Sequence, residues 1–162
     1  MVQYKRGINY INIPTTTLSQ IDSSIGGKTA IDMGEVKNAI GTIYQPNLVV
    51  IDFDTLKTLD KYQFSSGLVE ALKAGLLNDA KIIDLFNDVD KNLEEIIFRS
   101  LKVKQKVVEE DVFEKGIRKH LNLGHTIGHS IEILGNISHG EAVGLGMLYV
   151  IKNEELKEKI ED

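Results

Sequence analysis

Polar or ionisable side chains recur between residues 118 and 132 at successive spacings of four, three, four and three. They are Arg118, Asn122, His125, His129 and Glu132. Such spacing is typical of one face of an α-helix. Most polar helix faces are simply solvated, but they consist mainly of Lys and Glu, whereas this one carries two histidines beside an arginine and an asparagine. We interpret this face as part of a catalytic site.

Two glycines interrupt the same segment, at Gly124 and Gly128. Each costs a helix about 1 kcal/mol relative to alanine. Close packing against another element, or close approach of a ligand, would explain that cost.

A second candidate group is the pair Glu70 and Lys73, three residues apart on a helix predicted over 66–77. A surface ion pair is the simpler interpretation. However, the residues around the pair are almost all apolar, which predicts a mostly buried helix in which a carboxylate needs a partner. A metal ion would serve as that partner.

His139 stands just before a predicted helix over 141–151. With Glu70 and either His125 or His129 it completes a set of two histidines and a carboxylate, which is typical of a catalytic zinc ion with an open coordination position. Spacing alone does not choose between His125 and His129. The chain has no cysteine, so only histidine and carboxylate side chains remain as ligands for a transition metal.

Lys104 follows Ile97 and Leu101 and precedes Val108 at helical spacing, where an apolar residue is expected. The lysine either extends along the helix to reach solvent or directs its ammonium group into a site. The pattern favours neither alternative.

The segment from Asp22 to Thr29 ends like a phosphate-binding P-loop, but that motif needs a glycine where Asp22 stands. A glycine pair remains, which allows backbone amides and Lys28 to approach an anion. Arg6 and the Lys37-Asn38 pair lie in segments expected near strand ends, where α/β proteins bind ligands. Together these residues favour an anionic ligand.

The amino-acid composition indicates the broad class of protein. The chain has 162 residues, of which 42% are hydrophobic and 27% charged, as in a globular domain. No apolar run is long enough to span a membrane, and the N-terminus lacks the layout of a signal peptide, so we expect a cytoplasmic protein. A net charge of -5 argues against a nucleic-acid surface.

Periodicity predicts strands over 8–13 and 48–52 and helices over 66–77, 80–88, 92–110, 117–134 and 140–160. Residues 1–60 therefore form an incomplete α/β unit, and residues 61–162 form an all-helical domain. Because so few strands do not make a stable sheet alone, we expect an α/β unit upstream.

Several motifs together resemble those of the 3-dehydroquinate synthase family. They are Pro14-Thr-Thr, Asp22-Ser-Ser-Ile-Gly-Gly-Lys-Thr, Lys37-Asn38, Tyr44-Gln-Pro, Asp54-Thr-Leu-Lys-Thr-Leu, Gly67-Leu-Val-Glu-Ala-Leu-Lys, Leu121-Asn-Leu-Gly-His-Thr-Ile-Gly-His and His139-Gly-Glu-Ala-Val. The resemblance implies a cytoplasmic, commonly dimeric enzyme that uses NAD and a divalent metal, usually zinc or cobalt. It implies conversion of 3-deoxy-D-arabino-heptulosonate 7-phosphate into 3-dehydroquinate and phosphate, in the shikimate route to aromatic amino acids. The implied fold is a helical metal-binding domain preceded by strands of an incomplete Rossmann-like domain.

The resemblance also implies residue roles. It makes Glu70, His125 and His139 the metal ligands and His129 a neighbour that contacts the substrate. Positions that match substrate contacts are Asp22, Lys73, Lys104, Arg118 and Asn122, with Arg6 and Lys28 as contacts to phosphate and substrate. Positions that match dinucleotide contacts are Thr15, Thr16, Lys37, Asn38 and Thr58.

The family's NAD-binding half, with its glycine-rich turn, is not found in this sequence. Two hypotheses follow. In the first, the chain is the metal- and substrate-binding half of a 3-dehydroquinate synthase, inactive as an isolated chain and catalytic when an NAD-binding half is supplied, in a homo-oligomer or by a complementing polypeptide. In the second, it is a non-catalytic metal-binding or subunit-interaction module. Another sugar-phosphate cyclase, or a metal-dependent alcohol or glycerol dehydrogenase, is a weaker alternative.

Overall fold

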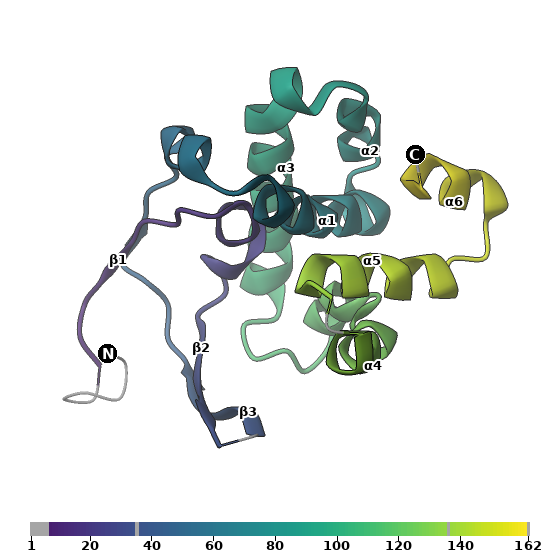
Figure 1. Cartoon of the computed structure of the whole chain (residues 1–162). Helices are drawn as coiled ribbons and strands as arrows, with labels where there is room; N and C mark the ends of the chain where they lie inside the picture. Colours follow the sequence, from purple (N-terminus) through teal and green to yellow (C-terminus); the bar gives the residue numbers. More distant parts are fainter. Residues whose placement is uncertain (1–6, 35, 136, 162) are drawn as a thin grey trace.

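The computed structural model describes residues 7–34, 36–135 and 137–161, without the side chains of Lys37, Lys159 and Glu161. Short strands come first and helices follow (Figure 1). The strands are β1 Ile11–Asn12, β2 Lys28–Met33, β3 Val36–Ile43 and β4 Leu48–Val49. The α-helices are α1 Lys61–Asn78, α2 Lys81–Leu85, α3 Val89–Glu110, α4 His125–Gly135, α5 His139–Val150 and α6 Glu154–Glu161. A π-helical turn spans Ser19–Ser23, and 3-10 segments span Phe53–Thr58, Phe86–Asp88 and Ile117–Asn122. This order confirms the predicted fold class, a helical domain preceded by a few strands.

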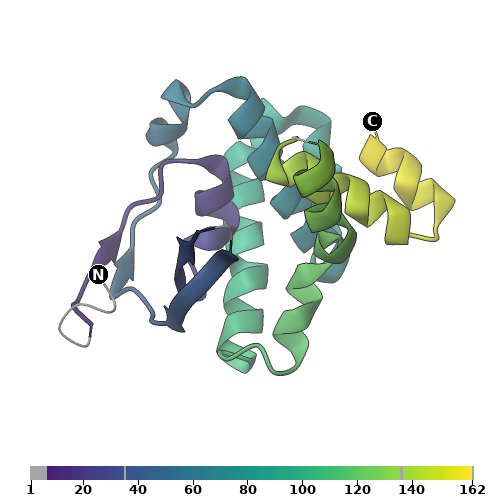
Figure 2. The ribbon, with the colours of Figure 1, turned by 60° about the horizontal axis from the view of Figure 1, so that its bottom comes forward.

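The main core lies between α1, α2 and α3. Ala71, Ile82, Ile96 and Ile97 are fully buried there. The π-helical turn packs against both α1 and α3 and adds Ile21 to the same core. The first third of the chain is therefore anchored on the helical region. In both ribbon views the strands lie on one side of α3 and α6 lies on the other (Figures 1 and 2).

The strands form separate pairs. β1 and β4 are parallel, with Ile11 opposite Leu48, so both predicted strands exist but are shorter than 8–13 and 48–52. β2 and β3 form an antiparallel hairpin, with Lys28 opposite Ile43, that the sequence did not predict. Its apolar side chains, such as Ile31, are largely exposed, so the hairpin lacks the alternation between a buried and a solvated face on which strand prediction depends.

The single helix predicted over 117–134 is wrong. The segment is a 3-10 stretch, Ile117–Asn122, followed by a separate helix α4 that begins at His125. The break falls at Gly124, whose φ of 79° lies in the left-handed region that favours glycine. A Cβ at Gly124 would lie 2.6 Å from the carbonyl oxygen of Val143 in α5. The glycine therefore serves both the turn and the close packing of α4 on α5.

The helices predicted over 66–77, 80–88 and 92–110 are confirmed with shifted ends, although the last turn of the second is a 3-10 segment. The single helix predicted over 140–160 is wrong. The predicted helix over 140–160 is divided into α5 and α6, because the chain is extended at Ile151 (φ -71°, ψ 127°). Gly128 confirms the expected close packing, because a Cβ there would lie 2.8 Å from the carbonyl oxygen of Ala142. Within the described residues, no helix is long and apolar enough to cross a membrane.

Candidate metal and substrate site

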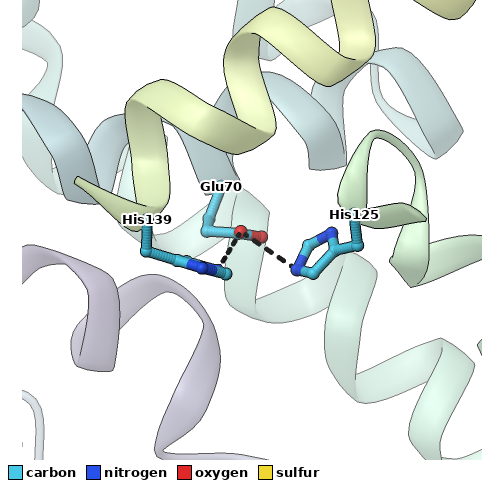
Figure 3. Close-up of side chains that lie close together, drawn as sticks. All are labelled: Glu70, His125 and His139. Atoms are coloured by element: carbon cyan, nitrogen blue, oxygen red, sulfur yellow. Dashed lines mark ion pairs between the residues drawn. The ribbon is translucent and has the colours of Figure 1, made fainter. Parts of the chain in front are cut away.

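Three potential metal ligands meet where α1, α4 and α5 converge (Figure 3). Glu70 comes from the middle of α1, and His125 and His139 are the first residues of α4 and α5. The Oε1 atom of Glu70 lies 3.8 Å from the Nε2 atom of each histidine. Donors bound at about 2.1 Å to a tetrahedral metal ion lie about 3.4 Å apart, so small side-chain shifts would close this set around zinc or cobalt.

The second ring nitrogen of each histidine, Nδ1, also lies close to an oxygen atom. The Nδ1 atom of His125 lies 3.2 Å from the backbone oxygen of Leu123, and Nδ1 of His139 lies 3.2 Å from Oε2 of Glu132. Acceptors at Nδ1 favour the proton on that nitrogen. Both rings then present an unprotonated Nε2 toward Glu70, as metal ligands require. The donor set fits a divalent metal.

The start of α5 is fixed on α1 by polar contacts. Ser138 and Glu141 form a capping box at the N-terminus of α5. The Tyr62 hydroxyl, from α1, donates to Oε2 of Glu141 at 2.5 Å. The backbone N–H of Gly140 donates to Oγ of Ser66 at 3.2 Å. These contacts place the first residue of α5, the third candidate ligand, beside Glu70.

Burial shapes the protonation of the cluster. Burial, reinforced by the nearby Lys73 charge, lowers the pKa of His125 to about 4, so its imidazole is neutral near pH 7. Burial raises the pKa of Glu70, and the ion pair with Lys73 opposes that rise. Both partners of this pair are almost fully buried. A cation bound at Glu70 would favour the carboxylate form in the same way.

A cavity of about 220 Å³ opens beside the ligand cluster. It is lined by Asp22, Lys28, Lys73, Lys104, Arg118, Leu121, Asn122, His125 and His129. The structure therefore brings together most of the residues predicted to contact the substrate. It also separates the two histidines that spacing could not distinguish, because His125 faces Glu70 whereas His129 groups with Glu132 and His139.

Lys104 directs its ammonium group into this cavity. The side chain is 9% exposed, and its Nζ lies 2.9 Å from Oδ1 of Asp22. It also contacts the backbone oxygen of Asp22. Burial lowers the pKa of Lys104, and Asp22 opposes that effect. The structure thus supports the second of the two alternatives for this lysine, because Lys104 is buried against a charged partner.

The guanidinium of Arg118 donates hydrogen bonds to uncharged backbone oxygens. The residue is 2% exposed, and its guanidinium donates to the backbone oxygens of Gly26 at 2.8 Å and Val112 at 2.6 Å. Its backbone N–H donates to the Asp111 carboxylate at 3.1 Å. The guanidinium is therefore fixed against the glycine pair of the predicted anion-binding turn.

Glu114 is a site residue that the sequence did not predict. Its carboxylate contacts Lys28 and accepts a hydrogen bond from Asn122 at 2.8 Å, so it links β2 to the 3-10 segment at the cavity. The residue has a φ of 57° and lies in the turn between α3 and that segment. Helical periodicity does not predict the positions of residues in such a turn, and no other pattern in the sequence points to this glutamate.

The residues predicted to touch the dinucleotide do not form one cluster. Nε2 of Gln20 donates to the carbonyl oxygens of Pro14 and Asp52 at 3.2 and 2.8 Å, which ties the Thr15-Thr16 segment to the start of the segment that contains Thr58. Asn38 lies instead on the β2–β3 hairpin, which projects at the lower end of the molecule in Figure 1. Arg6 lies outside the described residues, as does the side chain of Lys37.

Known proteins resemble this chain along most of its length. It is 46% identical over 165 residues to a 3-dehydroquinate synthase from Lactococcus lactis subsp. cremoris and 44% identical over 164 residues to one from Streptococcus thermophilus. Each alignment covers 95% of this chain and 46% of the relative. The chain therefore spans about half the length of the relatives that it matches.

Two solved structures share the fold. One is a 2-epi-5-epi-valiolone synthase from Streptomyces hygroscopicus subsp. jinggangensis with NAD+ and Zn2+ bound, 32% identical with a TM-score of 0.80 over 91% of this chain and 44% of that chain. The other is a 2-deoxy-scyllo-inosose synthase complexed with carbaglucose-6-phosphate, NAD+ and Co2+, 34% identical with a TM-score of 0.81 over 93% of this chain and 44% of that chain.

Family models agree with these likenesses. The model described as 3-dehydroquinate synthase N-terminal matches residues 2–66, and the model described as 3-dehydroquinate synthase C-terminal matches residues 67–162. The second match covers the three converging ligands and most of the cavity lining. The chain belongs to the 3-dehydroquinate synthase family.

Proposed function

We propose that the chain is the metal- and substrate-binding part of a 3-dehydroquinate synthase, which converts 3-deoxy-D-arabino-heptulosonate 7-phosphate into 3-dehydroquinate and phosphate. One observation carries the proposal. The cluster of Glu70, His125 and His139 opens onto a cavity lined by several cationic side chains. A divalent metal site beside a site for an anionic sugar is what this reaction requires.

The charges of the cavity support a phosphorylated substrate. Lys28, Lys73, Lys104 and Arg118 line it together with the single carboxylate of Asp22, in a chain whose net charge is -5. Such local enrichment in cations attracts a phosphate group. Nucleic acids and membranes are not among the partners that we propose.

When bound, NAD accepts and returns a hydride and the metal ion polarises a hydroxyl group of the sugar. The chain's own residues bind and orient the substrate. Lys104 and Asp22, which both line the cavity, form an ion pair. Asn122 is held by Glu114, and His129 lines the same wall as His125. We expect these side chains to contact the hydroxyl and phosphate groups of the sugar.

Binding of NAD is a further part of the proposal. Thr15, Thr16, Lys37, Asn38 and Thr58 match dinucleotide contacts of the family, and both solved neighbours hold NAD+. Because the chain spans about half of its relatives, we propose that the active form includes an NAD-binding half, in a homo-oligomer or from a complementing polypeptide. We place this assembly in the cytoplasm.

The first test is metal binding by calorimetry. We expect one zinc ion per chain and a strong loss of affinity in Glu70→Gln, which keeps the side-chain size but removes the charge. Glu94→Gln, at an exposed position of α3, is the matched control. Equal zinc affinity in the wild type and Glu70→Gln would refute the ligand assignment.

The second test is phosphate release from the heptulosonate phosphate, measured with NAD, zinc and the NAD-binding half of a family member. Release that requires all three would support the synthase. A folded, zinc-loaded chain that releases no phosphate in that mixture would instead favour a metal-binding or subunit-interaction module.

The solved neighbours favour one alternative function. They are a valiolone synthase and an inosose synthase, so the same fold serves other sugar-phosphate cyclases. The phosphate-release assay, repeated with glucose 6-phosphate, the sugar whose carba analogue is bound in the inosose synthase, separates these activities. A preference for glucose 6-phosphate over the heptulosonate would replace our assignment.

A further inference from the structure

The His139 ring lies between two carboxylates. Its Nε2 faces Oε1 of Glu70 at 3.8 Å, and its Nδ1 lies 3.2 Å from Oε2 of Glu132. We infer that Glu132 is a positioning residue that orients His139 for the metal ion and fixes its proton on Nδ1. This inference rests on the proposed metal site and adds Glu132, which is not among the three proposed ligands.

The contact has the geometry of a hydrogen bond. A separation of 3.2 Å lies within the range for an N–H donor and an oxygen acceptor. A carboxylate acceptor at Nδ1 keeps the proton there and makes Nε2 a more basic ligand. His125 differs, because its Nδ1 faces the neutral carbonyl of Leu123. Two different groups therefore hold the two candidate histidine ligands.

The surface of α4 sets Glu132 apart from a solvated glutamate. Ile133 and Leu134, the next two residues, are 76% and 87% exposed, whereas the Glu132 side chain is only 21% exposed. The helix thus exposes apolar groups and turns this carboxylate toward the histidines, the reverse of an ordinary amphipathic helix. Close packing of Gly128 on Ala142 fixes α4 against α5, so the orientation of Glu132 is maintained by the fold.

A different use of Glu132 is possible on geometry, because His129, Glu132 and His139 also have donor atoms within 4.8 Å of one another. A metal ion in that set that used Nδ1 of His139, the nitrogen beside Glu132, would require loss of the Nδ1 proton. A metal ion at Nε2 leaves that proton available to Glu132. The two arrangements therefore predict different numbers of bound metal ions and different roles for Glu132.

The test uses Zn2+ and Co2+ as probes and compares the wild type with Glu132→Ala, Glu132→Gln and the control Glu94→Gln. Calorimetry gives the affinity and the number of ions, the visible spectrum of the cobalt-loaded chain reports ligand geometry, and circular dichroism verifies folding. We expect one ion in every protein and an affinity about 10-fold or more weaker in Glu132→Ala, with an altered cobalt spectrum. The loss of affinity should be smaller in Glu132→Gln, because glutamine still accepts a hydrogen bond. If the alanine variant is unstable, the comparison of Glu132→Gln with the wild type decides the test.

Wild-type affinity and an unchanged cobalt spectrum in both Glu132 variants would overturn the inference. Two ions in the wild type and one in Glu132→Ala would also overturn it, because Glu132 would then be a ligand. Either result leaves the effect of Glu70→Gln in place, so the proposed metal site would stand. A wild type that binds neither ion, or a Glu70→Gln variant that binds as well as the wild type, would refute the metal site itself.

Discussion

Replacement of Gly140 by alanine should move α5 away from α1 and weaken metal binding. A Cβ at Gly140 would lie 2.0 Å from the carbonyl oxygen of Ser66, and contacts under 3.0 Å essentially never occur. The obstructing atom belongs to the backbone of α1, four residues before Glu70, so no rotation of a side chain relieves the clash. The start of α5 must retreat by about 1 Å.

That retreat determines the size of the effect. Overpacking of this kind costs about 1–3 kcal/mol of unfolding free energy, partly offset by up to about 1 kcal/mol because alanine favours helix more than glycine. Metal–ligand distances tolerate only about 0.2 Å. His139, the residue before Gly140, moves with the helix end, so we expect zinc affinity to fall by about 10-fold or more.

Gly144→Ala is the matched control on the same helix. The nearest atom to its added Cβ is Cγ1 of Val69 at 3.6 Å, an ordinary contact. This variant should be as stable as the wild type or more stable, by up to about 1 kcal/mol, and should bind zinc normally. Urea unfolding measures stability and calorimetry measures affinity. If Gly140→Ala matched Gly144→Ala in both, our account of how α1 positions His139 would be wrong.

Three further predictions concern the same region. The pKa of His125 is about 4 in the folded chain and about 6.5 when unfolded, so the unfolded state binds more protons between these values. The unfolding free energy of the metal-free chain should therefore fall as the pH is lowered from 6.5 to 4, by at most about 3 kcal/mol, and urea titrations should show a smaller fall in His125→Asn. Lys104→Met should weaken binding of inorganic phosphate by about 10-fold, measured by calorimetry, whereas Lys102→Met on the exposed face of α3 should not. Tyr62→Phe should lower the unfolding free energy by about 1 kcal/mol, because Glu141 loses a donor, and an unchanged urea midpoint would contradict this.

The sequence predicts site residues best where they lie on uninterrupted helices. Glu70 and Lys73 on α1 and Lys104 on α3 follow real helical periodicity, so their positions among apolar neighbours are predictable from the sequence. The direction of the Lys104 ammonium group is not, because the same pattern fits a lysine that reaches solvent. The sequence misplaces Arg118 and His125 on one helix, because the helix predicted over 117–134 breaks at Gly124. They reach the same cavity because the 3-10 segment and α4 follow one another along its wall.

Features that depend on turns or on distant elements are not predictable in this way. Glu114 contacts two residues of the cavity lining, Lys28 and Asn122, from a turn where it adopts a positive φ, and periodicity carries no information about such residues. The β2–β3 hairpin has exposed apolar side chains, so its sequence shows no buried face. The pairing of Glu132 with His139 joins two helices, and only the packing of α4 on α5 determines it.

The metal and anion sites support each other through their charges. Glu70 is buried with Lys73 as its ion-pair partner, and burial still raises the pKa of Glu70. A metal ion at Oε1 would therefore further stabilise the carboxylate form. Arg118, equally buried, donates two guanidinium hydrogen bonds to backbone carbonyls, which carry no net charge. A phosphate bound in the cavity would place a negative charge beside this guanidinium. Metal and phosphate would each favour the charged form of a buried group, and this is why we expect both to stabilise the folded chain.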